Sequence, residues 1–501
     1  MLNVFVALYL LLSIGVGLYA ARRVHNSTDY IVAGRRLPLH ITTATVFATW
    51  FGSETVLGTS STFITDGLGG IVADPFGASL CLIFVGLFFA RHLYRKNLVT
   101  IGDFFKQKYG RGVELATSVA IMLSYLGWVS AQMIALGLVF NVLSQGAITQ
   151  DVGIVLGAAI VIIYTIYGGM WSVALTDFMQ MIIIVLGMLY VGYVVTGEIN
   201  GGTMAVIEHA AQADKFNFWP EPTLAGILAF VGAFVTLALG SIPQQDVFQR
   251  VMSAKDENTA VRGAVLGGTL YFLFAFIPIF LAYSAFLIDE KMTSQLLESD
   301  SQLVLPTLIL QHTPMLAQVM FFGALLSAIM STASGTLLAP STIFTENILR
   351  PLKPHMSDKR LLLTMRCVTV VFTLMVTLYA LNSNSSIFKM VENAYQVTLV
   401  SAFVPLAFGV YWRRATNQGA LAAIFMGLSV WIGMSVTAGE ETIVPAQLAG
   451  LIASLVGLVM GSLMPQFLPH NHAVHDELKA GKHAHDSHHE SPSIDQRKHA
   501  Q

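Results

Sequence analysis

Charged residues are scarce in this chain. Asp, Glu, Lys and Arg make up only 11% of its 501 residues, whereas 54% are hydrophobic. Together with a mean hydropathy of +0.66, this composition excludes an ordinary soluble domain and predicts a membrane protein that crosses the bilayer many times. The formal net charge is only −2 and no basic stripe is present, so the sequence gives no sign of a nucleic-acid partner.

Cysteines and catalytic motifs are scarce as well. The only two cysteines, Cys81 and Cys367, both fall in apolar runs, so no disulfide framework is expected. The loops contain no nucleophile paired with a base, no metal-binding triad and no phosphate-binding loop. The sequence therefore predicts that the protein is not an enzyme.

Long apolar runs dominate the sequence. A helix needs roughly 17 to 25 such residues to cross the hydrocarbon layer. Thirteen candidate spans lie near residues 2–20, 39–64, 71–91, 113–143, 152–168, 171–196, 223–243, 262–287, 314–349, 361–381, 388–412, 418–437 and 444–464. We therefore predict an all-α polytopic membrane protein with 13 transmembrane helices.

The positions of the basic residues test this count, because Lys and Arg concentrate in cytoplasmic loops. If the N-terminus is outside, most of the 27 Lys and Arg residues fall in cytoplasmic loops or in the C-terminal tail. Only Lys215, Lys291 and Lys389 then lie outside. The alternation predicts an N-terminus outside the cell and a cytoplasmic C-terminus.

Two of the predicted spans are interrupted by small and polar residues. The second span contains Ala48-Thr-Trp-Phe-Gly-Ser-Glu54, and the seventh contains Leu239-Gly-Ser-Ile-Pro-Gln-Gln-Asp246. Freed backbone groups at membrane depth are tolerated where they line a protected cavity, so both breaks are candidate sites. Each break also opens a block of five spans, 39–196 and 223–412, which is the hydropathy pattern of an inverted repeat.

The expected organisation is therefore a transmembrane domain over residues 1–464. It comprises a first helix at 2–20, repeat one at 39–196, repeat two at 223–412 and last helices over 418–464. Residues 465–501 form a polar tail with many histidines, which cannot bury enough apolar area to fold. We expect this tail to be disordered and cytoplasmic.

The run from Gly323 to Gly335 places hydroxyl residues inside an apolar span. Ala328, Ser331 and Thr332 sit at positions i, i+3 and i+4, so one helix face offers two hydroxyl oxygens beside an approachable carbonyl. Hard monovalent cations such as sodium bind oxygens of this kind. The sequence therefore indicates an ion site on this helix.

Ionisable residues within spans are costly and often functional. They are Glu54, Asp177, Asp246 and Glu392. Asp177 is either a carboxylate with a structural partner or an anionic group beside a cation path. Glu54, in the first break, has three possible roles: it faces the solute, balances a cation or bonds freed amides. Asp74 precedes a proline and is expected to cap a helix.

These residues give the chain a resemblance to the sodium/solute symporter family, from the first helix to about residue 464. The segments that carry it are Ala48–Glu54, Tyr167–Gln180, Phe248–Arg250, and Ala328–Thr332 followed by Thr342–Thr345. The resemblance implies a leucine-transporter type of fold with 5+5 inverted repeats, one extra helix before them and two after. It also implies a main sodium site formed by the carbonyls of Ala48, Phe51 and Ala328 and the hydroxyls of Ser331 and Thr332.

A second sodium site found in some members would use Asp177, Ser331, Ser334 and the next residue, which is Gly335 here and carries no hydroxyl. The pattern is most similar to the choline-transporter branch, whose aromatic cage matches Trp50 and Trp128. Two other cage positions depart, with Gln244 in place of Trp and Ala78 in place of Tyr. We expect the solute beside both breaks, against Trp50, Glu54, Thr55, Trp128, Ser241 and Gln244.

The resulting hypothesis is a sodium-coupled symporter that imports a small organic solute by alternating access, with Na+ as the coupling ion. Three alternatives remain: a proton-coupled symporter with Asp177 or Glu54 titrating, choline or quaternary-amine uptake as the specific activity, and a solute sensor that does not transport. We expect a multi-pass protein of a bacterial inner (plasma) membrane, with the lipid bilayer, sodium and the solute as partners.

Overall fold

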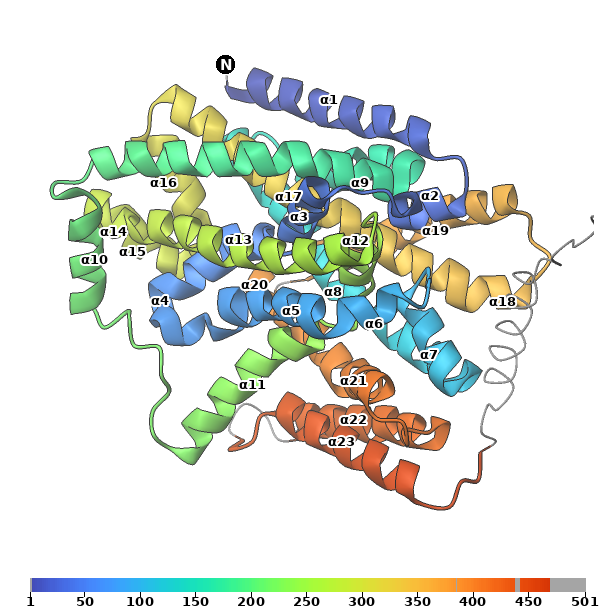
Figure 1. Ribbon diagram of the computed structural model, residues 1–501. Coiled ribbons are helices and arrows are strands. Elements are labelled where there is room, and N and C mark those ends of the chain that lie inside the picture. The colour runs from blue at the N-terminus through green and yellow to red at the C-terminus, as the bar shows by residue number, and fades with distance from the viewer. Residues whose placement is uncertain (1, 384, 438–441, 469–501) are drawn as a thin grey trace, which may run out of the picture.

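The computed structural model describes residues 2–383, 385–437 and 442–468, and within them every regular element is a helix (Figure 1). The longer or core-lining helices are α1 (Leu2–Ala20), α3 (Leu39–Trp50), α4 (Ser60–Gly70), α5 (Ala78–Phe84), α6 (Ala90–Tyr94), α8 (Arg111–Leu143), α9 (Gln150–Gly197), α11 (Leu224–Gly240), α12 (Gln245–Met252), α13 (Glu257–Tyr283), α17 (Met315–Ile343), α19 (Asp358–Leu381), α20 (Ile387–Thr398), α21 (Val404–Tyr411), α22 (Asn417–Thr437) and α23 (Ala446–Leu463).

Shorter helices connect these elements. They are α2 (Ser27–Val32), α7 (Ile101–Tyr109), α10 (Gly202–Gln212), α14 (Ala285–Ile288), α15 (Glu290–Ser299), α16 (Val304–His312) and α18 (Arg350–Leu352). Tighter 3₁₀ turns are η1 (Ala21–Arg23), η2 (Ala33–Arg35) and η6 (Ser301–Leu303), and wider π-helical turns are η3 (Glu54–Thr59), η4 (Val72–Gly77), η5 (Val85–Phe89), η7 (Phe344–Leu349) and η8 (Leu399–Phe403).

The helices form a bundle in which α17 packs against α8, α9 and α3. Figure 1 shows α1 along one edge of the bundle, beside α9, and the pair α22 and α23 along the opposite edge. Helices at the outside of the bundle carry apolar residues on all sides, because neighbouring helices bury one face and membrane lipid can cover the other. The middle of α17, from Leu325 to Thr342, is fully enclosed by other helices.

Helix α9 is too long to be one straight span. Its 48 residues would extend about 72 Å, more than twice the hydrocarbon thickness of roughly 30 Å. The backbone leaves the helical region at Gly169, where φ is 48° and ψ is −137°. This kink lies between the two spans expected at 152–168 and 171–196.

Both expected breaks are present. Helix α3 ends at Trp50 and the chain becomes helical again only at η3, while α11 and α12 are separated by a short break and bent by 45°. Within the described residues, ten helices are long and apolar enough to cross a membrane, or eleven if the bent pair counts as one span. The expected count of thirteen is not reached on this measure, which takes α9 as one helix and leaves out α3 and α4.

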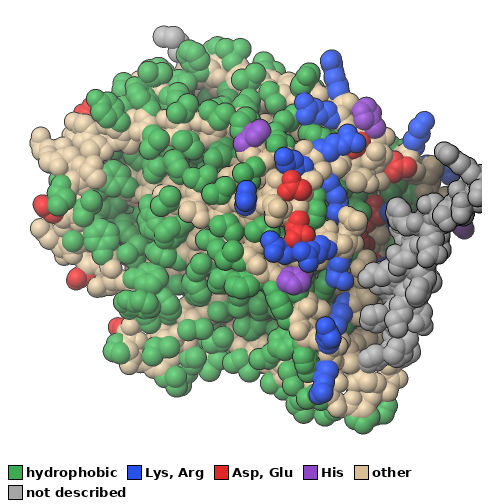
Figure 2. All heavy atoms as spheres, in the orientation of Figure 1, with side chains coloured by type: hydrophobic (Ala, Val, Ile, Leu, Met, Phe, Trp, Pro, Cys, Tyr) green, Lys and Arg blue, Asp and Glu red, His purple; other side chains and the backbone are tan. Residues whose placement is uncertain are grey.

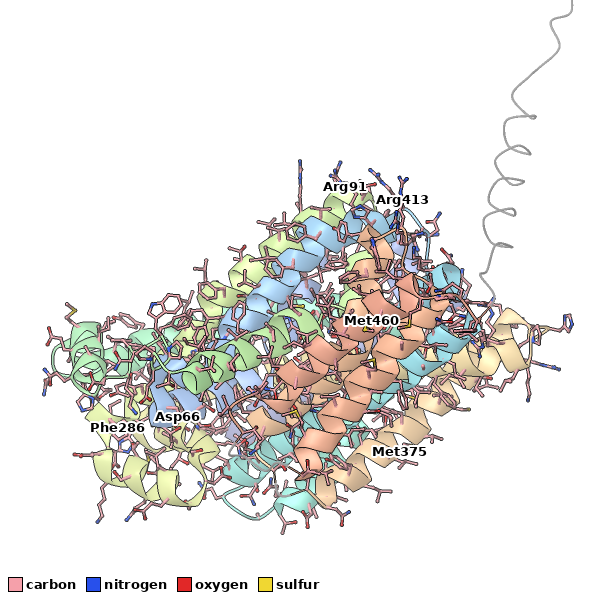
Figure 3. The ribbon with its side chains drawn as sticks, turned by 90° about the horizontal axis from the view of Figure 1, so that it is seen from below. Asp66, Arg91, Phe286, Met375, Arg413 and Met460 are labelled. Atoms are coloured by element: carbon pink, nitrogen blue, oxygen red, sulfur yellow. The ribbon has the colours of Figure 1, made fainter. Side chains whose placement is uncertain are left out.

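Basic residues gather towards one end of the molecule. Figure 2 shows Lys and Arg side chains gathered towards one end of the visible face, with the apolar surface covering most of the rest. In Figure 3, Arg91 and Arg413 lie close together on one side, and Asp66 and Phe286 lie at the far end. The histidine-rich segment from residue 469, expected to be disordered, lies outside the described residues.

Candidate functional site

The break after α3 frees a backbone carbonyl inside the bundle. Phe51 takes a non-helical conformation with φ −72° and ψ 79°, and the Gly52 amide donates to the Trp50 carbonyl at 2.7 Å instead of continuing the helical pattern to Ala48. The Ala48 carbonyl accepts a hydrogen bond from the Thr332 hydroxyl on α17 at 3.2 Å. This contact joins the broken segment to α17.

The predicted cation ligands of α17 face this junction. Ser331 and Thr332 are both fully buried, and Ala328 lies one turn earlier on the same buried stretch. A hydroxyl has one donor and two acceptor lone pairs, so Thr332 and Ser331 can each offer an oxygen lone pair to a cation. The structure therefore brings Ala48 and Thr332 into contact, and it places Phe51, Ala328 and Ser331 on the two segments that meet there.

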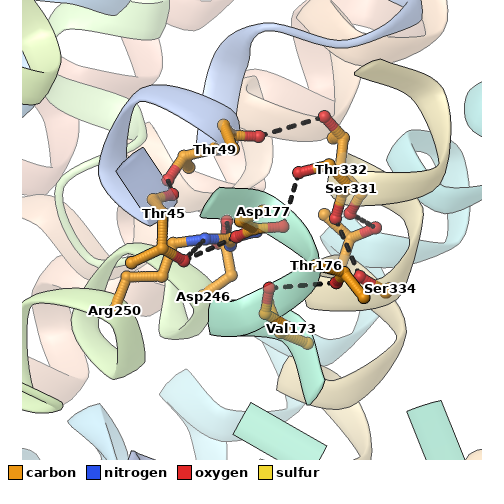
Figure 4. A network of polar contacts seen from close by, with 12 residues as sticks. Thr45, Thr49, Val173, Thr176, Asp177, Asp246, Arg250, Ser331, Thr332 and Ser334 are labelled. Atoms are coloured by element: carbon orange, nitrogen blue, oxygen red, sulfur yellow. Dashed lines mark hydrogen bonds and ion pairs between the residues drawn. The ribbon is translucent and has the colours of Figure 1, made fainter. Parts of the chain in front are cut away.

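Asp177 lies behind Ser331, as Figure 4 shows. Its carboxylate accepts hydrogen bonds from the Ser331 hydroxyl at 2.6 Å and from the Thr45 hydroxyl at 2.5 Å. Three helices thus meet on one carboxylate: α9 supplies Asp177, α3 supplies Thr45 and α17 supplies Ser331. The Ser334 hydroxyl does not join them, because it donates to the Ser331 carbonyl of its own helix at 2.9 Å.

A second carboxylate and a guanidinium complete this polar cluster. Arg250 on α12 pairs with Asp246 at 3.2 Å and with Asp177 at 3.6 Å. The Tyr125 hydroxyl of α8 donates to Asp246 at 2.5 Å. The Arg250 and Asp246 side chains are 1% and 0% exposed, so each charged group depends on the other for compensation.

An aromatic cluster lies on the other side of the α3 break. Trp50 stacks on Trp128 of α8 with ring centroids 5.3 Å apart, and Tyr395 of α20 packs edge-on against both, at 5.2 and 5.1 Å. Tyr125 stacks on the far side of Trp128 at 5.8 Å. All four rings are buried, so they contact one another in this conformation and would have to separate to admit a solute.

Glu54 lies at the edge of this aromatic cluster. It accepts hydrogen bonds from the Trp128 indole at 3.3 Å and from the Gln132 amide at 2.8 Å. The Gln132 carbonyl oxygen in turn accepts from the Ser53 amide at 3.2 Å, so a side chain of α8 satisfies the freed backbone of the break. Among the described residues, no Lys or Arg forms an ion pair with Glu54.

Thr55 faces a different group of polar residues. Its hydroxyl bonds to the Tyr271 hydroxyl at 2.9 Å, donates to the Trp50 carbonyl at 2.9 Å and lies 3.4 Å from Asp74. Asp74 also accepts from Thr59 at 2.7 Å and from Tyr271. The expectation that Asp74 caps a helix is wrong, because its carboxylate instead bonds hydroxyls that approach from η3 and α13.

The second break supplies Ser241 and Gln244. The Gln244 amide donates to the Ser124 hydroxyl at 3.1 Å and to the Thr398 hydroxyl at 3.3 Å. Ser124 adjoins Tyr125, and Thr398 follows Tyr395 by one turn. The Gln244 carbonyl oxygen and the Ser241 hydroxyl are buried without a hydrogen-bond partner among the described residues. Such atoms are the ones that a bound solute could satisfy.

Several residues of this region were not identified from the sequence. Thr45 and Gln132 are uncharged and belong to no recognised motif. Tyr395 is one of 15 tyrosines, and no motif singles it out from the others. Arg250 was recognised only as part of Phe-Gln-Arg. Glu392, singled out with Asp177, proves to be only partly buried. Helix periodicity from Glu392 would have pointed to Tyr395, one turn away on the inner face.

Curated transporters resemble this chain along most of its length. The high-affinity choline transporter 1 of Torpedo marmorata is 30% identical over 453 residues, covering 85% of this chain and 75% of that protein. The osmoregulated proline transporter OpuE of Bacillus subtilis is 24% identical over 463 residues, covering 90% and 92% of the two chains.

Among solved structures, a Na+-coupled sialic acid symporter in a substrate-bound outward-open state superposes with a TM-score of 0.78 at 21% identity, covering 94% of this chain and 98% of that one. This likeness shows an all-helical, leucine-transporter-like fold. Residues 30–427 match the sodium:solute symporter family. The chain is therefore a multi-pass membrane protein that belongs to the sodium:solute symporter family.

Proposed function

We propose that this protein imports a small organic solute together with sodium. The observation that carries the proposal is the 3.2 Å contact between the Thr332 hydroxyl and the Ala48 carbonyl, which joins the broken α3 segment to α17. The proposed sodium ligands are the carbonyls of Ala48, Phe51 and Ala328 and the hydroxyls of Ser331 and Thr332. The Thr332 hydroxyl donates to the Ala48 carbonyl, and rotation of the hydroxyl hydrogen away from the carbonyl frees a lone pair on each oxygen for a cation.

Coupling follows from where the ion binds. Sodium between α3 and α17 links two segments that must move apart when the site opens to the other side of the membrane, so the ion stabilises one state over the other. If sodium tightens solute binding, the solute tightens sodium binding by the same factor. An inside-negative potential contributes about 2.3 kcal/mol per charge for each 100 mV, which drives accumulation of the solute.

The proposal includes an architecture of thirteen spans. Counting α9 as two spans at Gly169, α11 with α12 as one and α3 with α4 as one supports this number. The spans form a first helix at 2–20, inverted repeats at 39–196 and 223–412, and last helices over 418–464. We place the N-terminus outside, and residues 465–501 as a disordered tail in the cytoplasm of a bacterial cell.

The aromatic cluster favours one class of solute. Trp50, Trp128 and Tyr395 present ring faces and edges to one another, and Glu54 next to them has no Lys or Arg ion-pair partner among the described residues. A cation over an aromatic face gains roughly 0.5–2 kcal/mol. The second candidate function is therefore uptake of an organic cation such as a quaternary amine, with Trp50, Glu54, Thr55, Trp128, Ser241 and Gln244 around the site.

Uptake into proteoliposomes with imposed gradients tests the proposal. A panel of labelled amino acids, sugars, carboxylates and quaternary amines is offered with an inward sodium gradient, with an inward proton gradient, or with neither. We expect accumulation of at least one solute class under the sodium gradient alone. Competition by quaternary amines would assign the organic-cation class.

The same experiment separates the alternatives. Accumulation driven by the pH gradient and indifferent to sodium would establish the proton-coupled symporter. A solute that stabilises the purified protein thermally but is never accumulated would indicate a sensor. Protein-free liposomes and liposomes containing Asp177→Asn protein are the matched controls.

A further inference from the structure

The buried arginine of α12 lies against Gly335 of α17. The Arg250 side chain is about 1% exposed and its Nε donates to the Thr45 hydroxyl at 3.3 Å. Its two terminal nitrogens pair with Asp246 and Asp177. Removing a guanidinium from water costs several kcal/mol unless it is paired, so this position is set by the two carboxylates.

Gly335 is what allows the guanidinium to lie there. A Cβ on Gly335 would lie 2.2 Å from Nη2, 2.6 Å from Nη1 and 2.7 Å from Cζ of Arg250. No real Cβ contact is that short, so even a serine at this position would displace the arginine. The guanidinium fills the volume in which a residue-335 hydroxyl would stand in a second sodium site.

We propose that the Arg250 guanidinium is a tethered cation that occupies the second cation site, so that this transporter binds one sodium ion per cycle and not two. This inference rests on the proposed sodium coupling and on the main site between α3 and α17. The other groups of the second site form hydrogen bonds within the protein. Asp177 accepts from Ser331 and Thr45, and Ser334 bonds its own helix.

The charges of the cluster lead to the same conclusion. Asp177 and Asp246 carry two formal negative charges and Arg250 carries one positive charge, and among the described residues no other Lys or Arg pairs with either carboxylate. One sodium beside Ser331, whose hydroxyl bonds Asp177, makes the group neutral. A second sodium would leave an uncompensated positive charge in a region shielded from water, where it is costly.

Arg250 also links the ion site to the second helix break. It lies on α12, directly after that break, and Asp246 on the same helix bonds Tyr125 of the aromatic cluster at 2.5 Å. A free second ion would enter and leave in every cycle, whereas a guanidinium stays attached to α12. Asp246, on the same helix as Arg250, therefore keeps its positive partner when α12 moves.

Equilibrium binding of ²²Na+ to the purified protein tests this inference without knowledge of the solute. We expect the wild type to saturate at one ion per chain with a Hill coefficient of 1. The double variant Arg250→Ala, Gly335→Ser removes the tethered cation and supplies the missing hydroxyl, and we expect it to bind two ions with a Hill coefficient above 1. Arg250→Lys keeps the positive charge and should bind one.

The outcomes distinguish this inference from the proposed function. Two ions bound to the wild type, or one ion bound to a double variant that elutes as a monodisperse peak, would overturn the tethered-cation proposal and leave sodium coupling intact. No sodium binding to the wild type would instead overturn the proposed function. Two sodium ions bound to the wild type would overturn the tethered-cation proposal even if the variants fail to fold.

Discussion

At the scale of single residues, the site depends on hydroxyls that serve two partners at once. Ser331 donates to Asp177 at 2.6 Å and still has lone pairs for a cation. Thr332 donates to the Ala48 carbonyl and can rotate away from it. Hydroxyls suit this position because each can donate when the ion is absent and accept when it is present.

Removing these hydroxyls is expected to weaken sodium binding. In Ser331→Ala and Thr332→Ala, the sodium ion loses one of its oxygen ligands, at a cost to sodium binding of about 1–2 kcal/mol. Such a cost corresponds to a roughly 5- to 30-fold higher sodium concentration for half-maximal uptake. The measurement is solute uptake as a function of sodium concentration.

Ser341→Ala provides a matched control on the same helix. Ser341 is also buried, but its hydroxyl donates to the Leu337 carbonyl within α17. We expect its sodium dependence to equal that of the wild type. If both site variants behaved like this control, the ligand assignment would be wrong.

At the scale of elements, the breaks in α3 and between α11 and α12 place the site. The close approach of α3 and α17 depends on Gly52, where a Cβ would lie 2.6 Å from the Thr332 hydroxyl and 3.0 Å from Glu54. A side chain at residue 52 would therefore push the broken segment away from α17. The absence of a side chain here keeps both the ion ligands and Glu54 in place.

Gly52→Ala is accordingly expected to separate α3 from α17. A displacement that weakens sodium binding by 1.4 kcal/mol would raise the sodium concentration for half-maximal uptake about tenfold. A larger displacement would abolish uptake. Gly323→Ala on α17 is the control, because a Cβ there meets no atom within 4 Å. Equal sodium dependence of the two variants, measured at matched protein density in the membrane, would contradict the proposed junction.

The sequence predicted the breaks but not everything that fills them. Glycine, serine and proline inside apolar runs mark helix interruptions through local backbone chemistry, so the α3 and α11–α12 breaks could be located from the chain alone. The partners of Glu54 and Asp177 could not, because Gln132 and Thr45 reach them through packing between helices distant in sequence. The ligand assignments themselves came from the family resemblance and stay predictions.

The length of α9 shows a further limit of prediction from hydropathy. The sequence contains two apolar runs separated by Gly168-Gly169, whereas the structure has a single helix, α9, with a kink at Gly169. Hydropathy locates apolar residues but does not state whether hydrogen bonding continues between them. Span counts therefore differ between the sequence and the structure even where the underlying segments agree.

At the scale of the whole molecule, basic residues gather at one end. Figures 2 and 3 show basic residues gathered at one end, with Arg91 and Arg413 together and Asp66 far from them. Arg91 and Arg95 also meet on Glu257, each at 2.8 Å, which ties the end of α6 to the start of α13. Basic residues remain on the cytoplasmic side of a membrane protein, so this end is expected to face the cytoplasm.

Cysteine labelling in whole cells tests that orientation. The native Cys81 is buried and Cys367 exposed, so the parent carries Cys81→Ala and Cys367→Ser, and single cysteines are added as Lys291→Cys or Arg413→Cys at exposed positions. We expect a membrane-impermeant maleimide to label residue 291 in intact cells, because Lys291 lies on the side proposed to be outside, and residue 413 only after permeabilisation. The parent itself is the control and should not react. The reverse pattern would invert the proposed topology.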